Sequence, residues 1–279
     1  MNNTNSLNNR KILVCCGTGC LANGSMEVYK VFEKMLTGSG IKVDTEIKCT
    51  GCNGLCEKGP VVKIQPDDIA YYHVKAGDVE EIVEKTIKHG QAVERLLYLE
   101  PSTGKRILSH KDTEFNKRQR KIALRNIGEI DPSSIEDYID HGGFKALHKV
   151  IDTYTSDDII AEIKKSGLRG RGGAGFPTGV KWESCKNIQK YPKYVVCNGD
   201  EGDPGAFMDR SIMEGDPFSI LEGMLICAYA IKAEKGFIYI RDEYSLAIKN
   251  ITKAIEAARQ RGYLGKNVLG SGFSFDIDI

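Results

Sequence analysis

"VCCGTGCLANGS" (residues 14–25) and "CTGCNGLCEKGP" (residues 49–60) are two short segments rich in cysteine and glycine. They contain six of the nine cysteines of this 279-residue chain. Clustered cysteines hold a disulfide, a zinc ion or an iron–sulfur cluster. Structural disulfides are rare in the reducing cytosol, and nine cysteines cannot all pair within one chain, so metal or redox chemistry is favoured.

Composition excludes several classes of partner. The 39 basic and 38 acidic residues leave a net charge of +1, so no overall field points to nucleic acid or to an anionic membrane. No apolar run reaches the roughly 18–20 residues that span a bilayer, and "MNNTNSLNNRK" lacks the core of a signal peptide. We expect a cytoplasmic protein of two modest domains, with no nucleic-acid partner and no transmembrane segment.

The first part of the chain predicts a small α/β domain. Residues 1–10 are rich in Asn and are expected to form a disordered tail, and residues 11–90 form the domain. Its expected helices are 25–36, capped by Ser25, and 77–88. Its expected strands are "KILVC" (11–15), "IKVDTEIK" (41–48), "PVVKI" (60–64) and "IAYYHV" (69–74).

The second part alternates helical and strand patterns. Residues 91–150 give mixed signals and are expected to be a connector with short helices, and residues 151–279 form the second domain. Its expected helices are 156–167, 217–234 and 245–262, and its expected strands lie in "YPKYVVCNG" (191–199) and "KGFIYIRDE" (235–243). Alternating strands and helices predict a parallel sheet.

The cysteine spacing favours an iron–sulfur cluster. Four residues separate Cys15 from Cys20, and three separate Cys52 from Cys56. If the strands before the two segments are joined by a right-handed helical crossover, both loops lie at the same end of the sheet and four thiolates can converge. Four cysteines on loose loops suit a 2Fe-2S cluster, whereas zinc more often takes two C-x-x-C pairs. Cys49 and Cys52 form one such pair, so zinc remains an alternative.

"CCGTGC" together with "GCNGLCEKGP" resembles the thioredoxin-like 2Fe-2S ferredoxin domain of complex I and its hydrogenase relatives. The family pattern implies four cluster ligands: Cys15, Cys20, Cys52 and Cys56. Cys16 and Cys49 fall outside the pattern, and no ligand role is assigned to them.

A second motif is the glycine-rich segment "GLRGRGGAGFPTGVKW" (residues 167–182). Unhindered backbone amides in such a loop can approach a phosphate or a flavin, and Arg169, Arg171 and Lys181 supply positive charge. The segment follows a helix rather than a first strand and contains no Walker lysine–threonine pair, so it is neither the usual dinucleotide fingerprint nor a P-loop.

The whole segment, with "CNGDEGDPGAFMDR" (197–210), resembles the NADH-binding flavoprotein subunit of complex I and of soluble NAD(P)-linked hydrogenases and formate dehydrogenases. The resemblance runs from about residue 11 to the end. It implies an α/β chain in which a thioredoxin-like 2Fe-2S ferredoxin domain precedes an incomplete Rossmann-like FMN/NADH-binding domain. It also implies partner subunits of such an assembly.

The resemblance further implies roles for individual residues in this sequence. Phe176 would stack on the adenine of the nicotinamide nucleotide, although a place in the core is the simpler reading, and the acidic loop could be only a solvated turn. The residues that would lie at or near the FMN are Gly170, Arg171, Gly172, Gly173, Lys181, Asn198, Asp200 and Glu201.

A flavin and a one-electron cluster on one chain predict electron transfer. A nicotinamide gives up two electrons as a hydride, a 2Fe-2S centre accepts one, and a flavin connects the two kinds of transfer. No catalytic side chain is required. The resemblance therefore implies electron transfer between NAD(P)H and iron–sulfur centres through FMN. The alternatives are a non-enzymatic 2Fe-2S carrier or docking module and a structural zinc protein.

The ending "NVLGSGFSFDIDI" (267–279) alternates like a strand that has begun to pair. Relatives continue with a second glycine-acid motif, a ubiquitin-like domain and a helical domain that carries a 4Fe-4S cluster. The resemblance thus predicts a fragment truncated within the flavin domain. We expect weak FMN binding by the isolated chain and a 4Fe-4S cluster only in the missing part.

Overall fold

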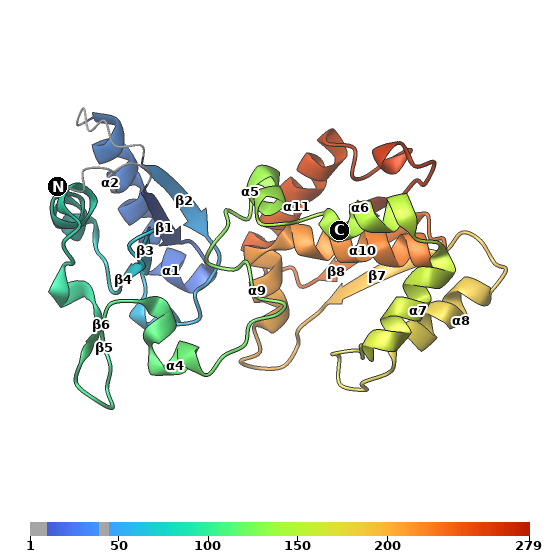
Figure 1. The fold of residues 1–279 in the computed structure, drawn as a ribbon, viewed down its shortest axis with the longest axis horizontal. Coiled ribbons are helices and arrows are strands. Elements are labelled where there is room, and N and C mark those ends of the chain that lie inside the picture. The colour runs from blue at the N-terminus through green and yellow to red at the C-terminus, as the bar shows by residue number, and fades with distance from the viewer. Residues whose placement is uncertain (1–9, 39–44) are drawn as a thin grey trace, which may run out of the picture. The chain divides into compact units, whose positions relative to one another are not determined.

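The computed structural model describes residues 10–38 and 45–279, which form two compact units divided after Pro132 (Figure 1). The boundary divides the segment 91–150 between the units. Residues 1–9 of the expected tail lie outside the described residues. For Arg10 the tail prediction is wrong, because its guanidinium is buried and donates to the Asp67 carboxylate and to the Ile87 carbonyl.

A four-stranded sheet of order β2-β1-β3-β4 forms the centre of the first unit. Its strands are β1 (Lys11–Cys15), β2 (Glu46–Thr50), β3 (Val62–Gln65) and β4 (Ile69–Tyr71). β1 and β2 are parallel, whereas β3 is antiparallel to both of its neighbours. All four predicted strands are therefore present, although residues 41–44 of the second lie outside the described residues.

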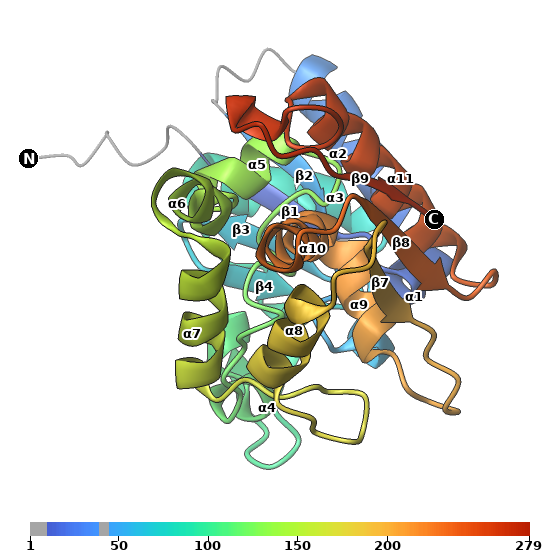
Figure 2. The same ribbon diagram turned by 90° about the vertical axis from the view of Figure 1, so that its right-hand side faces the viewer.

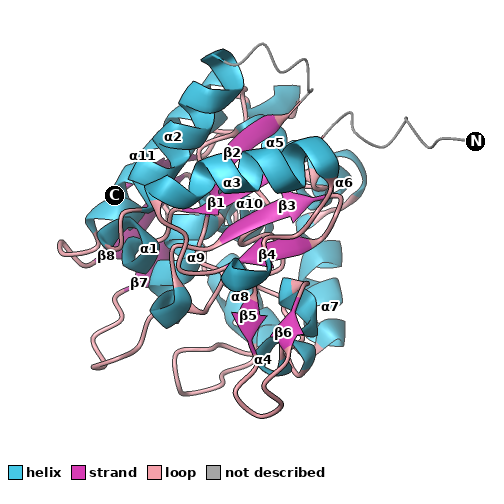
Figure 3. Cartoon of the chain, turned by 90° about the vertical axis from the view of Figure 1, so that its left-hand side faces the viewer, coloured by secondary structure: helices cyan, strands magenta, loops and turns pink. Residues whose placement is uncertain are grey.

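Three α-helices accompany this sheet: α1 (Thr18–Ala22), α2 (Ser25–Gly38) and α3 (Val79–Ile82). α2 and α3 lie over the strands in Figure 3, and Val28 and Phe32 of α2 pack into the same core as Ile12 of β1. The apolar spacing predicted this helix correctly. The Ser25 cap was wrong, because the Ser25 hydroxyl is buried without a hydrogen-bond partner.

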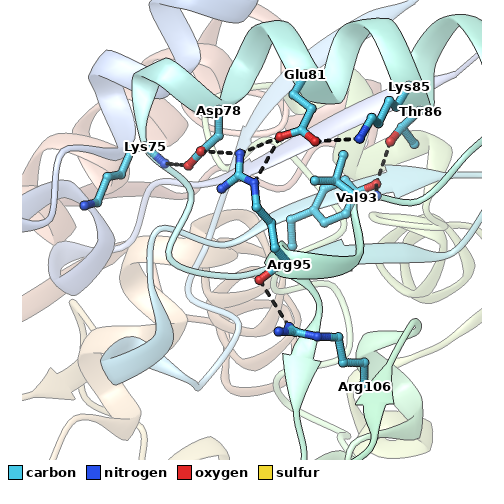
Figure 4. Close-up of polar contacts among 9 residues, drawn as sticks. Lys75, Asp78, Glu81, Lys85, Thr86, Val93, Arg95 and Arg106 are labelled. Atoms are coloured by element: carbon cyan, nitrogen blue, oxygen red, sulfur yellow. Dashed lines mark hydrogen bonds and ion pairs between the residues drawn. The ribbon is translucent and has the colours of Figure 1, made fainter.

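The closing helix of the first unit is continuous but not uniform. A 3₁₀ turn (Ala76–Asp78) precedes α3, and a π-helical turn (Val83–Ile87) follows it. Arg95 donates to Asp78 at 2.7 Å and to Glu81 at 2.6 Å, which ties the following segment to this helix (Figure 4).

Residues 91–132 complete the first unit. They contain a small hairpin of β5 (Tyr98–Leu99) and β6 (Arg106–Ile107), followed by α4 (Glu114–Lys117). Glu129 near the end of this segment binds Lys63 at 2.6 Å and Gln65 at 2.7 Å, both on β3. The Lys63 side chain is buried in this ion pair, so this segment packs on the sheet.

The second unit contains a three-stranded parallel sheet, as predicted, of order β7-β8-β9. Its strands are β7 (Tyr194–Gly199), β8 (Lys235–Ile240) and β9 (Asp276–Asp278). Its helices are α5 (Ile135–Asp140), α6 (Lys145–Thr153), α7 (Ser156–Ser166), α8 (Thr178–Asn187), α9 (Met208–Gly215), α10 (Pro217–Ile231) and α11 (Ser245–Gln260). The sequence did not predict α8 and α9. Among the described residues, no helix is long and apolar enough to cross a membrane.

A buried carboxylate, Glu222 on α10, links three helices of the second unit. Its carboxylate accepts hydrogen bonds from the Tyr138 hydroxyl at 2.5 Å, the Phe144 amide at 3.0 Å and the Leu147 amide at 3.1 Å. Since the side chain is buried, these three donors supply the partners that a buried carboxylate needs. α5 and α6 are thereby fixed to α10.

Candidate cofactor sites

The parallel pairing of β1 with β2 brings the two cysteine loops to the same end of the first sheet. Cys15 pairs in register with Thr50, and both cysteine loops leave the sheet directly after these residues. Cys52 Sγ lies 3.3 Å from Cys56 Sγ. The Cys15 thiol interacts with those of Cys20 and Cys52, so the four predicted ligands form one connected group.

These contacts change the acidity of the thiols. Hydrogen bonding with Cys20 raises the pKa of Cys15 to about 11, and the same contact lowers the pKa of Cys20. Hydrogen bonding with Cys15 raises the pKa of Cys52. Without a metal, the thiols therefore hydrogen-bond to one another. A bound metal would displace their protons, because the thiolate is the form of cysteine that binds metal.

Glycines press directly on three of the four cysteines. A Cβ added at Gly17 would lie 2.8 Å from Cys52 Cβ, and one added at Gly59 would lie 2.5 Å from Cys20 Sγ. At Gly19 it would lie 3.1 Å from Cys56 Cβ. These positions admit only glycine without displacement, so the glycines allow the two loops to approach one another.

The segment 110–132 covers the loop between Cys52 and Cys56. Phe115 lies over Gly54, and the backbone at Gly128 contacts the side chain of the buried Asn53. His110 is buried beside them, and its Nδ1 lies 2.8 Å from the Tyr72 hydroxyl. Burial lowers the pKa of His110 to about 4, so the ring is neutral at pH 7.

Cys16 and Cys49 form a separate pair. Their Sγ atoms lie 2.6 Å apart, and hydrogen bonding with Cys16 lowers the pKa of Cys49. Cys49 and Cys52 were considered above as half of a zinc site. In the structure they have different partners, because Cys49 contacts Cys16 and Cys52 contacts Cys56.

The four-cysteine group has the donors that a 2Fe-2S cluster requires, which are four thiolates. Across residues 10–38 and 45–279, no three His, Cys, Asp or Glu side chains are arranged around a single metal ion. A two-iron cluster requires a different arrangement, because each iron takes two of the four cysteines. The pairwise contacts of the thiols fit that requirement.

In the second unit, the glycine-rich segment forms a closed loop between α7 and α8. Arg169 and Pro177 form an antiparallel bridge, and the Gly170 amide donates to the Phe176 carbonyl at 2.9 Å. A Cβ at Gly172 or Gly173 would meet nothing within 4 Å. The tip of the loop is therefore open to a ligand.

The predicted residues of this segment are all exposed, including Arg171 and Phe176 (54 % exposed) on the loop and Lys181 on α8. Placement of Phe176 in the core, the alternative to nucleotide stacking, is therefore wrong for the described residues. The glycine loop and the acidic loop after β7 emerge at the same end of the unit, the lower end in Figures 1 and 2.

The acidic loop is more ordered than a solvated turn. The Glu201 carboxylate accepts from the Asp209 and Arg210 amides at the start of α9, at 3.1 and 3.2 Å. Arg241 donates to the Glu201 carbonyl at 2.8 Å. Asn198 Oδ1 accepts from the Asp200 amide at 3.0 Å, and both of these side chains are exposed.

A cavity of about 1070 Å³ in the second unit lies elsewhere. Its walls include Tyr154, Tyr229 and Phe273, and none of the residues predicted to contact FMN or the nucleotide lines it. The residues predicted to bind FMN and the nucleotide therefore lie outside this cavity, and the two loops remain the candidate site.

Comparison with known proteins agrees with this division. Residues 1–87 match the thioredoxin-like [2Fe-2S] ferredoxin family, and residues 163–279 match the Nuo51 FMN-binding domain. A thioredoxin-like [2Fe-2S] ferredoxin from Aquifex aeolicus is 40 % identical, covering 32 % of this chain and 89 % of its own, with a TM-score of 0.30.

Longer relatives match more than half of the chain. The NADP-reducing hydrogenase subunit HndC of Solidesulfovibrio fructosivorans is 54 % identical over 167 residues, which are 60 % of this chain and 34 % of HndC. An NADH-quinone oxidoreductase subunit of Aquifex aeolicus is 48 % identical over 146 residues, which are 52 % of this chain and 34 % of that relative. The chain thus spans about a third of the length of these relatives.

The chain belongs to the thioredoxin-like [2Fe-2S] ferredoxin family in its first part, and its second part matches the Nuo51 FMN-binding domain. The family matches confirm the predicted resemblance, and the sheets and helices of both units confirm the predicted α/β fold class. The roles assigned to individual cysteines, glycines and acidic residues remain predictions.

Sequence reasoning missed the residues that support the cysteine group. Gly17, Gly19 and Gly59 were visible as glycines, but their contacts with sulfur depend on the folded loops. His110 gave no signal at all, because its burial depends on packing of the segment that follows the first domain. The contact of Cys16 with Cys49 joins residues 33 positions apart.

Proposed function

We propose that the chain is part of a flavoprotein subunit that transfers electrons between NAD(P)H and iron–sulfur centres through FMN. The observation that carries this proposal is the presence on one chain of a ferredoxin-family unit with four gathered cysteines and of an FMN-binding domain. The names of its relatives support an assembly of the NAD(P)-linked hydrogenase or NADH dehydrogenase type, with other subunits as partners. A cytoplasmic location belongs to the same proposal.

In the first unit, Cys15, Cys20, Cys52 and Cys56 would hold the 2Fe-2S cluster. The cluster would exchange single electrons, and FMN in the second unit would exchange a hydride with the nicotinamide. The chain's own contribution is to keep four thiolates together at one end of a sheet, where close-packed glycines allow the two cysteine loops to approach and the segment 110–132 contacts the loop between Cys52 and Cys56.

In the second unit, the glycine loop would contribute amides and positive charge, and the acidic loop would contribute acceptors. Gly170, Gly172 and Gly173 would lie under the flavin with Arg171 and Lys181 nearby. Glu201 is held by amides of α9, which fixes one acceptor before any ligand binds. Asn198, Asp200 and Phe176 are exposed and able to reach a ligand.

Anaerobic reconstitution with iron and sulfide tests the cluster. We expect about two irons and two acid-labile sulfides per chain. Cys52→Ser should lose most of the bound iron, whereas Cys185→Ser, a partly exposed cysteine of the second unit, should keep it. Zinc without sulfide, or equal iron in both variants, would contradict the proposal and favour a structural metal.

Flavin titration separates the proposal from a second candidate, a 2Fe-2S carrier without flavin chemistry. That candidate is favoured by the containment of all four cysteines within the first unit. On the proposal, FMN fluorescence is quenched by the chain and NADH bleaches the flavin absorbance. Asp200→Ala should weaken the quenching, whereas the exposed Glu256→Ala on α11 should not. A chain that binds a cluster but leaves FMN fluorescence unchanged would favour the carrier.

A further inference from the structure

Cys16 and Cys49 are brought together by the same strands that carry the proposed cluster ligands. Cys49 lies on β2 opposite Val14 of β1, and Cys16 follows β1 directly. Since side chains two residues apart in a strand share a face, Cys16 and Val14 lie on the same side of the sheet as Cys49. The result is a distance of 2.6 Å between the two sulfurs.

The pair is distinct from the four-cysteine group. Cys15 packs with Cys20, Val61 and Tyr72 in one cluster, whereas Cys16 packs against the core formed with α2 on the other face. Two adjacent cysteines therefore serve different faces of the sheet. Cys16 could join the four-cysteine group only if the end of β1 rotated so that its side chain pointed to the other face of the sheet.

The geometry of the pair suits a covalent bond between the sulfurs. A separation of 2.6 Å exceeds the disulfide bond length of about 2.05 Å by roughly half an ångström, so a small shift of either side chain closes it. Both cysteines are partly exposed, which gives a small reagent access. Thiol–disulfide exchange requires such access as well as a neighbouring second thiol.

We propose that Cys16 and Cys49 form a redox-active dithiol site that a small-molecule disulfide converts to an intramolecular disulfide. One of the two, as a thiolate, attacks the reagent disulfide, forms a mixed disulfide and releases one reagent thiol. The second attacks the mixed disulfide and releases the other reagent thiol. The chain loses two electrons and two protons, and the reagent disulfide is reduced to two thiols.

The bond would join β1 to β2 at the ends from which both cysteine loops leave. Cys16 is the direct neighbour of Cys15, and Cys49 lies three residues before Cys52. The ratio of small-molecule thiol to disulfide in solution would thereby control whether the two strands that precede the proposed ligands are covalently linked. Formation of the disulfide itself does not depend on the cluster, so it is measurable on the metal-free chain.

The test equilibrates the purified chain anaerobically with graded mixtures of reduced and oxidised glutathione. Free thiols are then alkylated, and fragment-ion mass spectrometry assigns each site after digestion. We expect Cys16 and Cys49 to lose their alkylation in equal proportion and to be recovered linked to each other, while Cys185 keeps its alkylation. Continued alkylation of both, or recovery of Cys49 linked to Cys52, would overturn the proposal.

Two variants make the assignment specific. In Cys49→Ala, Cys16 should stay alkylated or carry glutathione, with no link to another cysteine of the chain, and Cys16→Ala gives the reciprocal result. Cys227→Ala, a partly buried cysteine of the second unit, should leave the link between Cys16 and Cys49 intact. If Cys16 forms an equally abundant link to another cysteine in Cys49→Ala, the pairing is not selective and the site is disproved.

Discussion

The two units surround their candidate residues in opposite ways. In the first, a Cβ at Gly17 would lie 2.8 Å from Cys52 Cβ, and one at Gly59 would lie 2.5 Å from Cys20 Sγ. In the second, a Cβ at Gly172 or Gly173 would meet nothing within 4 Å. Close packing thus positions the cysteines before any cofactor binds, whereas the glycine loop keeps room for a ligand.

This difference concerns the loops and not the units that carry them. The second unit has a closely bonded interior, in which Glu222 satisfies donors from two other segments. An open binding loop on a rigid scaffold is a common arrangement for ligand sites, because the scaffold fixes the ends of the loop.

The largest effect is expected from Glu222→Ala. Loss of the carboxylate leaves the Tyr138 hydroxyl and the Phe144 and Leu147 amides without their acceptor, which should lower the free energy of unfolding of the second unit by about 3–5 kcal/mol. Urea unfolding followed by circular dichroism measures it. Glu256→Ala, on the exposed face of α11, should change little. Equal destabilisation by the two variants would show that the Glu222 contacts do not support the scaffold.

Acid should destabilise the first unit through His110. Burial lowers its pKa from 6.5 to about 4 in the folded chain, so the unfolded chain binds more protons between these values. The free energy of unfolding should therefore fall as the pH drops, by roughly 2 kcal/mol between pH 7 and pH 5. His110→Gln should remove most of this dependence and the exposed His89→Gln should keep it. An unchanged pH dependence in His110→Gln would assign the effect to other groups.

Sequence periodicity predicted the strands and long helices because their apolar spacing is local. "KILVC" and the helix from Ser25 are examples. The placement of residues 91–132 could not be predicted from the sequence, because it depends on the long-range ion pair of Glu129 with Lys63. The roles of individual glycines could not be predicted either. Gly17 and Gly172 are the same residue type, and only the fold shows that Gly17 packs against Cys52 while Gly172 lies in open space.

Gly17→Ala tests whether the close packing around the cysteine group is needed to retain iron. The backbone φ of −66° at Gly17 is accessible to alanine, so any cost comes from the contact with Cys52. We expect overpacking to cost about 1–3 kcal/mol and to reduce the iron retained after reconstitution. Gly77→Ala is the matched control in the same unit, since its Cβ would meet nothing within 4 Å. Iron retention equal to that of Gly77→Ala would show that the loop adapts.

The smallest effects are expected in the glycine loop itself, where Gly172 and Gly173 separate steric contact from backbone conformation. Neither Cβ would meet a neighbour, but Gly173 has a φ of +102°, which alanine rarely adopts. Gly173→Ala should therefore cost about 1 kcal/mol, and Gly172→Ala should leave the free energy of unfolding nearly unchanged. If Gly172→Ala nevertheless weakens FMN quenching, the space above that residue is used by the ligand, as the proposed site requires. If Gly172→Ala changes neither unfolding nor FMN quenching, close approach of the flavin at this position is excluded.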